Sequence, residues 1–408
     1  MIDGARIGIV AEHDPFHEGH RRNIEAARAA VGGGRVVVAL SSSFVQRGEP
    51  ALVDKWARAE MALACGADLV VELPFPFACA AAPDFAAGGV DVLARSGLVT
   101  HLAFGMERPW LDLDALADVS VHEPPAYRSR LREGLEGGAS WARAATSALE
   151  EAVPSCAGLR DHPNDLLALS YVAHIRRCGY DVVPVPLPRQ GGAHGDVALE
   201  RGASASALRA AVRGGVPSED ARVMAAMPPA SLTVLRRERE EGRLSLSLDA
   251  MWTMARAVLL RSSAEDLRRI DGMDEGIEGA LSKRWKEATG LEDLIERCAS
   301  PRWSRARLRR LVVRMLVGLD RWTARAVRRV GPPYVRVLGW GPPGREMLRE
   351  ARGAPLRIIG RLGAAGDPIG RRVAELERRA SALREMCLAT PDLRREDRRR
   401  PVGSERPA

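Results

Sequence analysis

Residues 8–20 read GIVAEHDPFHEGH, an apolar run that passes directly into a polar loop rich in histidine. The run Ile7–Ala11 has the β-branched composition of a buried strand, and Arg21–Val31 carries alanine at helical spacing. A loop between a strand and a helix presents unpaired backbone N–H groups and the positive end of the helix dipole to an anion, and Gly19 lets the backbone approach that anion closely. This stretch predicts the first unit of an α/β sheet, with a phosphate-binding loop at the strand end.

The same alternation of strands and helices continues through the first half of the chain. Strands that alternate with helices form a parallel sheet whose faces are both covered, and the ligand crevice lies at the carboxyl ends of the strands. We expect a Rossmann-like α/β domain over residues 1–215. Its strands are expected at Ile7–Ala11, Val36–Leu40, Leu69–Leu73, His101–Phe104 and Val182–Leu187, and its helices at Arg21–Val31, Asp54–Ala64, Phe85–Ala94 and Asp165–Arg177.

The second half has a different pattern, in which no run resembles a buried parallel strand. The Gly/Pro/Ser stretch Gly214–Ser218 marks the boundary. Residues 216–390 are expected to form a mainly α-helical domain, and residues 391–408, which lack an apolar period, a disordered tail. The expected helices are Leu232–Glu241, Leu248–Arg261, Gly276–Ala288, Ser304–Leu319 and Asp367–Leu388.

Charge divides the chain in the same place. The 408 residues carry a formal net charge of +8, with −6 up to residue 210 and +14 after it. An acidic half that also holds all eight histidines suits proton chemistry, and a basic half suits a polyanion. No apolar run is long enough to span a membrane, the start lacks a signal-peptide pattern, and the six cysteines lack CxxC spacing. We therefore expect a cytoplasmic protein without membrane contact, disulfide scaffold or structural zinc.

His17 and His20 are the residues in the first loop best suited to chemistry. Two imidazoles three residues apart can both donate hydrogen bonds to phosphoryl oxygens as charge develops during nucleotidyl transfer. A metal pair or a capped helix start are the other interpretations, but a third zinc ligand is missing at an obvious spacing.

These motifs resemble the HxGH nucleotidyltransferases, and the longer GIVAEHDPFHEGH resembles the tRNA(Met) cytidine acetate ligase family. Further stretches resemble motifs of that family in the same order, over most of the chain. They are SSFVQRGEPALVDKW (42–56), FGME (104–107), HPND (162–165), PR (188–189), SASALR (204–209), PRWSRAR (301–307) and PYVRVLG (333–339). The chain departs from the family pattern at His13 and Asp14 (usually Tyr-Asn), and at Ser43 and Asp165 (each usually Asn).

The resemblance implies an ATP-dependent ligase that activates acetate as acetyl-adenylate and acetylates N4 of the wobble cytidine of elongator tRNA(Met). It implies Mg²⁺ with the ATP, no coenzyme A and no obligate protein partner. The implied catalytic residues are His17, His20 and Lys55. The implied ATP-binding residues are Val10, Ala11, Glu12, His13, Asp14, Pro15, Phe16, His17, Glu18, Gly19, His20, Gly105, Asn164, Arg189, Ser204, Ser206 and Arg209.

The chemistry of several of these residues is consistent with the implied role, and each of them also has a simpler structural interpretation. Lys55 is the only lysine before residue 283 and could neutralise departing pyrophosphate, or could be left by compositional drift. Arg189, beyond the last expected strand, could clamp a phosphate or form a surface ion pair. Ser204, Ser206 and Asn164 could contact ATP or simply cap helices. Gly105 could allow close approach of a nucleotide or sit in an ordinary turn, and Gln46-Arg47-Gly48 is a polar loop suited to substrate contact.

A run of arginines marks the basic half. Between Arg302 and Arg329 ten arginines face the single acid Asp320, with Trp303 and Trp322 among them. A stripe of one sign with aromatic side chains suits an RNA backbone and splayed bases. High arginine usage on an ordinary surface is the alternative. The expected tRNA-binding residues are Arg302, Arg305, Arg307, Arg309 and Arg310.

Two other functions fit parts of the sequence. An adenylyltransferase acting on a small phosphorylated metabolite needs the same HxGH loop but no basic helical half. A non-catalytic RNA-binding protein with a retained nucleotide fold needs the basic half but no reactive loop.

Overall fold

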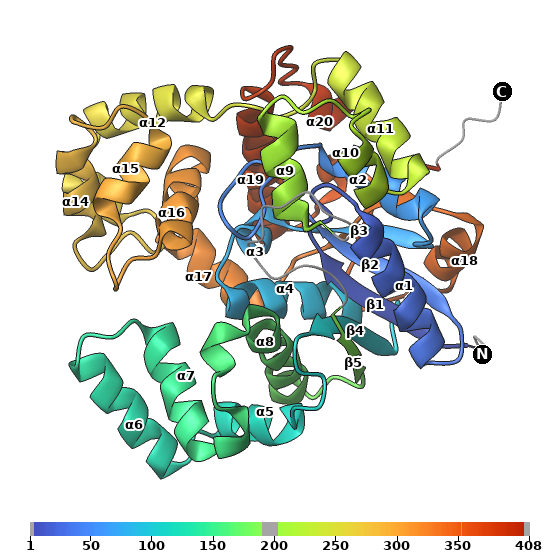
Figure 1. Ribbon diagram of the computed structural model, residues 1–408, viewed down its shortest axis with the longest axis horizontal. Coiled ribbons are helices and arrows are strands. Elements are labelled where there is room, and N and C mark those ends of the chain that lie inside the picture. The colour runs from blue at the N-terminus through green and yellow to red at the C-terminus, as the bar shows by residue number, and fades with distance from the viewer. Residues whose placement is uncertain (1–3, 190–202, 352, 404–408) are drawn as a thin grey trace.

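The computed structural model describes residues 4–189, 203–351 and 353–403. Within them, seven strands form one sheet in the order β5-β4-β1-β2-β3-β6-β7 (Figure 1). Strands β1 to β5 run parallel, β6 is antiparallel to β3, and β7 is parallel to β6. The strands are β1 (Arg6–Ala11), β2 (Arg35–Ser41), β3 (Leu69–Leu73), β4 (His101–Met106), β5 (Val183–Pro188), β6 (Val335–Trp340) and β7 (Ile358–Ile359).

The two faces of the sheet are covered by different helices because side chains alternate along each strand. On β2, Val36, Val38 and Leu40 pack with α1, α2, α9 and α11, whereas Val37 and Ala39 pack with α4, α5 and α8. The expected Rossmann-like α/β architecture is therefore confirmed. These helices are α1 (Glu18–Ala30), α2 (Lys55–Ala64), α4 (Ala82–Ala94), α5 (Leu113–His122), α8 (Pro163–Cys178), α9 (Ala205–Arg213) and α11 (Pro229–Glu240).

A further group of helices lies beside the sheet domain, on the left of Figure 1. Its core is made by α12, α14, α15 and α16 together with Phe44 and Phe75 from the first half. No helix in the described ranges is long and apolar enough to cross a membrane. The remaining helices are α3 (Phe75–Ala78), α6 (Pro125–Glu136), α7 (Trp141–Ala152), α10 (Ala221–Ala226), α12 (Asp249–Arg261), α13 (Ala264–Arg268), α14 (Ile277–Arg284), α15 (Leu291–Cys298), α16 (Arg305–Val317), α17 (Arg321–Val330), α18 (Pro342–Glu350), α19 (Pro368–Glu385) and α20 (Arg395–Arg398).

The second half is mainly helical, as expected for residues 216–390, but it also contains two strands that the sequence did not lead us to expect. Its strands β6 and β7 extend the sheet of the first half, next to β3. Arg336, the second residue of β6, is a charged side chain inside a buried strand, and this charge made the strand hard to predict from the sequence. Its guanidinium is paired with Glu72 of β3 and Glu396 of α20, so the strand can be buried despite its charge.

Residues 391–403 of the tail pack against the rest of the chain, so the expectation of disorder is wrong for them, and residues 404–408 lie outside the described residues. Helix α20 places Glu396 in the interior with 7% of its surface exposed. Val402 continues the packing, since its N–H donates to Leu338 O at 2.8 Å and its carbonyl accepts from Trp340 N at 3.0 Å. The tail lacks an apolar period because ion pairs and backbone hydrogen bonds anchor it instead.

Candidate active site

A cavity of about 610 Å³ lies at the carboxyl ends of β1, β4 and β5. The parallel strands bring loops from distant parts of the sequence to this one edge. Helices α1, α8 and α9 complete the wall. The predicted ATP-binding residues that line the cavity are Val10, Glu12, His17, Glu18, Gly19, His20, Gly105, Asn164, Arg189, Ser204, Ser206 and Arg209.

The remaining predicted residues of the first loop lie outside the cavity lining. Ala11 ends β1, and His13, Asp14, Pro15 and Phe16 are buried. The ring of His13 packs edge-on against Phe16, with 4.7 Å between ring centroids. These residues pack beneath the loop and support its conformation, and none of them lines the cavity.

Hydrogen bonds from backbone N–H groups determine which ring nitrogen of His17 and of His20 carries the proton. His17 is the N-cap of α1, and its Nδ1 accepts the N–H of Gly19 at 3.0 Å. Nδ1 of His20 accepts the N–H of His17 at 3.2 Å. A neutral imidazole whose Nδ1 accepts a hydrogen bond carries its proton on Nε2. Both rings therefore keep an Nε2–H donor, and they stack with centroids 3.8 Å apart.

Burial keeps these imidazoles neutral. Desolvation, together with the nearby guanidinium groups of Arg189 and Arg209, lowers the pKa of His17 to about 4. Desolvation and the neighbouring His17 and His13 also lower the pKa of His20 well below its usual value. Two uncharged hydrogen-bond donors thus face a cavity whose positive charge comes from arginine.

Three elements hold the loop in place. Nη1 of Arg58, on α2, donates to Glu12 O at 2.6 Å. Oδ1 of Asp14 accepts the N–H of Leu52 at 2.7 Å, and the Asp14 carbonyl accepts from Nη1 of Arg209 at 2.6 Å. Because backbone and side-chain groups of the loop are tied to α2, α9 and the segment before α2, the histidines are fixed in position before any ligand arrives.

Glu107 organises the opposite wall, although sequence reasoning did not assign it to the site. Its Oε1 accepts from Nδ2 of Asn164 and from Nη1 of Arg189, the latter at 3.4 Å. Its Oε2 accepts the N–H of Asp165 at 3.2 Å. The FGME motif contained this glutamate, but a carboxylate that positions an amide and a guanidinium looks like any other surface acid in the sequence.

Helix α9 also presents its N-terminus to the cavity. Ser204 caps the helix by accepting the N–H of Ala207 at 3.2 Å, and Ser206 Oγ accepts from Nη2 of Arg209 at 3.2 Å. The capping interpretation of Ser204 is confirmed, and the serine also lines the cavity. Cavity residues absent from the sequence-based assignment include Arg21, Arg22, Asn23, Phe104, Tyr171 and Met227.

The polar loop 46–48 contributes one side chain to the cavity. Arg47 lines it, whereas Gln46 is not among the lining residues. The backbone of Gln46 instead joins two regions, since its N–H donates to Glu12 Oε1 at 2.7 Å and its carbonyl accepts from Arg310 at 3.1 Å. Gly48 has φ +78°, and a Cβ there would lie 2.5 Å from Arg310 N, so the approach of α16 requires glycine.

Lys55 does not line the cavity, and its assignment as a catalytic residue is corrected. Its ammonium is 1% exposed and lies among the carboxylates of Glu72, Glu377 and Glu396, with the last at 3.0 Å. Burial opposes its charge, but these three carboxylates outweigh burial and raise its pKa. A lysine is therefore present at position 55 because it neutralises buried carboxylates of β3, α19 and α20, and not because it contacts pyrophosphate.

The arginines expected to bind tRNA are mostly paired with acids from neighbouring helices and loops. Arg305 donates to Glu296 over distances of 2.6 and 2.8 Å, and Arg309 pairs with Glu292. Arg302 and Arg307 both approach Glu275. Arg310 is largely buried, and desolvation lowers its pKa to about 10. The positive charge of these arginines is thus largely neutralised by acidic side chains that lie close to them in the folded chain.

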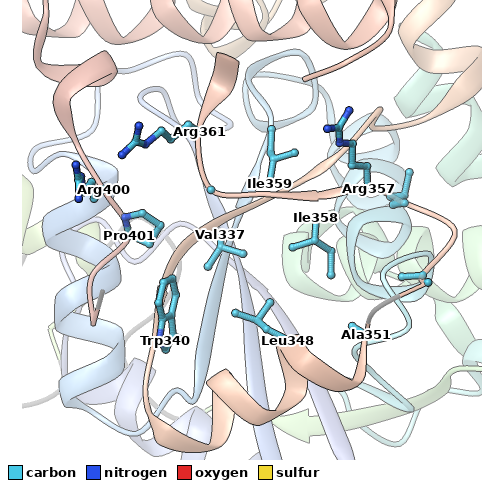
Figure 2. A pocket seen from close by; sticks show the side chains of 14 residues that line it. Val337, Trp340, Leu348, Ala351, Arg357, Ile358, Ile359, Arg361, Arg400 and Pro401 are labelled. Atoms are coloured by element: carbon cyan, nitrogen blue, oxygen red, sulfur yellow. The ribbon is translucent and has the colours of Figure 1, made fainter. Parts of the chain in front are cut away.

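A second cavity of about 760 Å³ lies at the β6–β7 edge of the sheet (Figure 2). Its floor is apolar, with Val337, Leu348 and Ile358 among the lining side chains. In the described part of the chain, no hydrogen bond or ion pair joins an acid to any of its three arginines, Arg357, Arg361 and Arg400. None of the predicted site residues lies here.

Comparison with known proteins agrees with this geometry. A model of the HIGH nucleotidyl transferase family matches residues 5–399. The tRNA(Met) cytidine acetate ligase of Syntrophomonas wolfei is 36% identical over 353 residues, which cover 85% of this chain and 84% of the relative. That of Acetivibrio thermocellus is 30% identical over 400 residues, covering 95% and 96%.

Solved structures extend the likeness to the whole fold. Thermotoga maritima TmcAL in its apo form superposes with a TM-score of 0.89 and 29% sequence identity, covering 97% of this chain and 98% of that one. A second structure of the same protein, bound with alpha-thio ATP, gives a TM-score of 0.88 over the same shares. The chain therefore belongs to the HIGH nucleotidyl transferase family and, within it, to the tRNA(Met) cytidine acetate ligases.

Proposed function

We propose that this chain uses ATP to activate acetate as acetyl-adenylate and transfers the acetyl group to N4 of the wobble cytidine of elongator tRNA(Met). Family membership supports the overall reaction. The observation that carries the chemistry is the pair of neutral Nε2–H donors of His17 and His20 at a cavity edged by arginine. Such fixed donors stabilise a phosphoryl group most when its charge increases in the transition state.

In the first step, an acetate oxygen attacks the α-phosphorus of ATP, and the bond to the bridging oxygen of the β-phosphate breaks. His17 and His20 donate hydrogen bonds to the phosphate oxygens, while Arg189 and Arg209 supply positive charge for the departing pyrophosphate. The capped N-terminus of α9 adds backbone N–H groups at Ser206. Chemistry of this kind depends on position and charge, so no covalent enzyme intermediate is needed.

In the second step, N4 of cytidine attacks the acetyl carbon, and AMP leaves with the electron pair of the broken bond. The N4 proton is lost to solvent or to the leaving phosphate. Coenzyme A has no part in this scheme. Because the acyl group is already activated, the main requirement is a dry, fixed approach of the base to the adenylate.

The acidic residues of the cavity are compatible with a Mg²⁺ ion bound to the triphosphate of ATP. Glu12 and Glu18 are the acids among the described residues that line it, and Glu18 is paired with Arg21. Oε1 of Glu12 accepts the N–H of Gln46, which leaves Oε2 for a cation. One carboxylate suits Mg²⁺, which binds mainly phosphate oxygens and water in such sites. The ion would neutralise charge on the leaving pyrophosphate.

We propose two surfaces of the basic half for tRNA. The first is the predicted set Arg302, Arg305, Arg307 and Arg309, where a phosphate must compete with the carboxylates already present. The second is the groove with Arg357, Arg361 and Arg400, where no acid among the described residues competes. Arg310 is assigned to the contact between α16 and the loop at Gln46. With tRNA as the substrate, the cytoplasm is the compartment we propose.

The test separates this function from its two rivals. Pyrophosphate exchange into ATP should require acetate and proceed without tRNA, and tRNA(Met) treated with the complete system should contain N4-acetylcytidine by mass spectrometry. Transfer of AMP to a phosphorylated metabolite without acetate would favour the adenylyltransferase. Binding of tRNA without any exchange would favour a non-catalytic protein.

A further inference from the structure

The contact between α4 and α8 holds a cluster of metal-binding side chains outside the ATP cavity. Asp91 projects from α4, and His174 and Cys178 come from α8. The two α8 residues are four apart and therefore lie on one face of the helix. One ligand atom from each of the three residues lies within 4.8 Å of the others.

The distance between His174 and Cys178 matches that of a tetrahedral site, and the distance between His174 and Asp91 is shorter. Nε2 of His174 and Sγ of Cys178 are 3.6 Å apart. A tetrahedral zinc ion with ordinary Zn–N and Zn–S bonds holds these two atoms about 3.5 Å apart. Oδ1 of Asp91 lies 2.8 Å from the same Nε2, a hydrogen-bond distance that has to widen by roughly 0.5 Å for a metal to enter between them.

The surroundings resemble those of a bound ion. Tyr180 donates its hydroxyl hydrogen to Asp91 Oδ1 at 2.7 Å, the kind of outer contact that orients a ligating carboxylate. The side chains of Asp91 and His174 are only 10% and 15% exposed, whereas Cys178 is exposed and leaves a route for entry. Arg95 donates to Val330 O at 2.9 Å, and its Nη1 lies near Gly331, as does Oδ2 of Asp91.

We propose that Asp91, His174 and Cys178 bind one divalent transition-metal ion of the zinc class, with water in the fourth position. A thiolate and an imidazole select such ions over Mg²⁺ and Ca²⁺. On binding, the Cys178 thiol releases its proton to solvent, and the His174 imidazole coordinates the ion through Nε2 with a proton on Nδ1. The hydrogen bond between His174 and Asp91 is replaced by two metal bonds, and no electron transfer is involved.

This site joins α4 and α8, two of the helices that cover one face of the sheet. Tyr171, one turn before His174 on α8, lines the ATP cavity. A metal at the α4–α8 contact therefore steadies one wall of that cavity without touching ATP. The proposal does not depend on the identity of the reaction, because it rests on the three side chains alone.

Cobalt provides the test, because Co²⁺ occupies zinc sites and reports its ligands by absorption. The full chain is stripped with a chelator and titrated with Co²⁺. We expect a thiolate-to-cobalt charge-transfer band in the near ultraviolet and visible bands of tetrahedral intensity, both saturating at one ion per chain. Added Zn²⁺ should remove both.

Matched variants identify the ligands. Cys178→Ser changes one exposed atom and should abolish the charge-transfer band, while Cys65→Ser, at the half-buried cysteine after α2, should leave it unchanged. His174→Asn should weaken cobalt binding at least tenfold, with circular dichroism confirming that the variant is folded. A wild-type spectrum of octahedral type, the absence of a charge-transfer band, or a band that survives Cys178→Ser would overturn the proposal.

Discussion

Replacing His17 by asparagine separates the two roles that the structure gives this residue. The ring caps α1 through Nδ1 and offers a donor through Nε2. Asparagine is among the best N-cap residues, and its Oδ1 can take the place of Nδ1. It has no atom at the position of Nε2. His17→Asn should therefore keep the cap and lose the donor.

The magnitudes differ enough to be measured. Loss of one preorganised donor to a developing oxyanion costs about 2.7–4 kcal/mol, or 10²–10³ in rate. Retaining the cap should leave the unfolding free energy within about 0.5 kcal/mol of wild type. The assay is acetate-dependent exchange of pyrophosphate into ATP, with urea denaturation for stability.

His17→Gln is the complementary variant, because its amide nitrogen can reach the position of Nε2 but its side chain cannot cap the helix. It should lose about 1 kcal/mol of stability and retain more of the exchange rate than His17→Asn. Wild-type exchange in His17→Asn would refute the donor role. Equal rate losses in both variants would show that ring shape, and not the Nε2 proton, is what the reaction needs.

Three further predictions test other parts of the structure. Because the pKa of His17 lies near 4, the rate of pyrophosphate exchange should show no imidazole titration between pH 6 and 8. The contribution of neutral His17 to the unfolding free energy should be complete above about pH 6.5, the pKa of histidine in the unfolded chain, and should decrease as the pH falls towards 4, which urea denaturation at several pH values would measure. Lys55→Met leaves three buried carboxylates short of a partner and should cost about 3–5 kcal/mol in urea denaturation while the exchange rate per folded molecule is retained. Changing Arg357, Arg361 and Arg400 together to alanine should lower the slope of log tRNA affinity against log salt by roughly 0.7 to 0.9 for each phosphate that the variant no longer binds, and an unchanged slope would exclude this groove from the interface.

Local pattern was sufficient for the parallel strands of the first half, but not for helices α5, α6 and α7, which were not expected. The strand expected at Leu69–Leu73 has the same bounds in the structure, and the one expected at Ile7–Ala11 differs by one residue. Buried parallel strands are short apolar runs, so neighbouring residues determine them. Since such strands end at one edge, the motifs after β1, β4 and β5 meet there, and that followed from topology alone.

Partners distant in sequence account for what the pattern missed. Arg305 pairs with Glu296 and Arg309 with Glu292, which lie on the preceding helix, so counting charge along 302–329 could not show that the stripe is compensated. The rarity of Lys55 indicated a constraint at that position but not its kind. A lysine that contacts phosphate and a lysine that is buried among carboxylates cannot be distinguished from a single sequence.

The cluster around Lys55 also explains why the two electrostatic halves cannot be treated as separable. Glu72 of β3 shares its carboxylate between Lys55 and Arg336 of β6, and Glu377 and Glu396 close the cluster from α19 and α20. Cutting the chain near residue 215 removes three of these five groups. It also exposes the edge of β3, which pairs with β6 in the intact sheet. Adenylate formation and tRNA capture therefore have to be separated by surface substitutions in the full chain, since truncation removes Arg336, Glu377 and Glu396 from the cluster that Lys55 and Glu72 share.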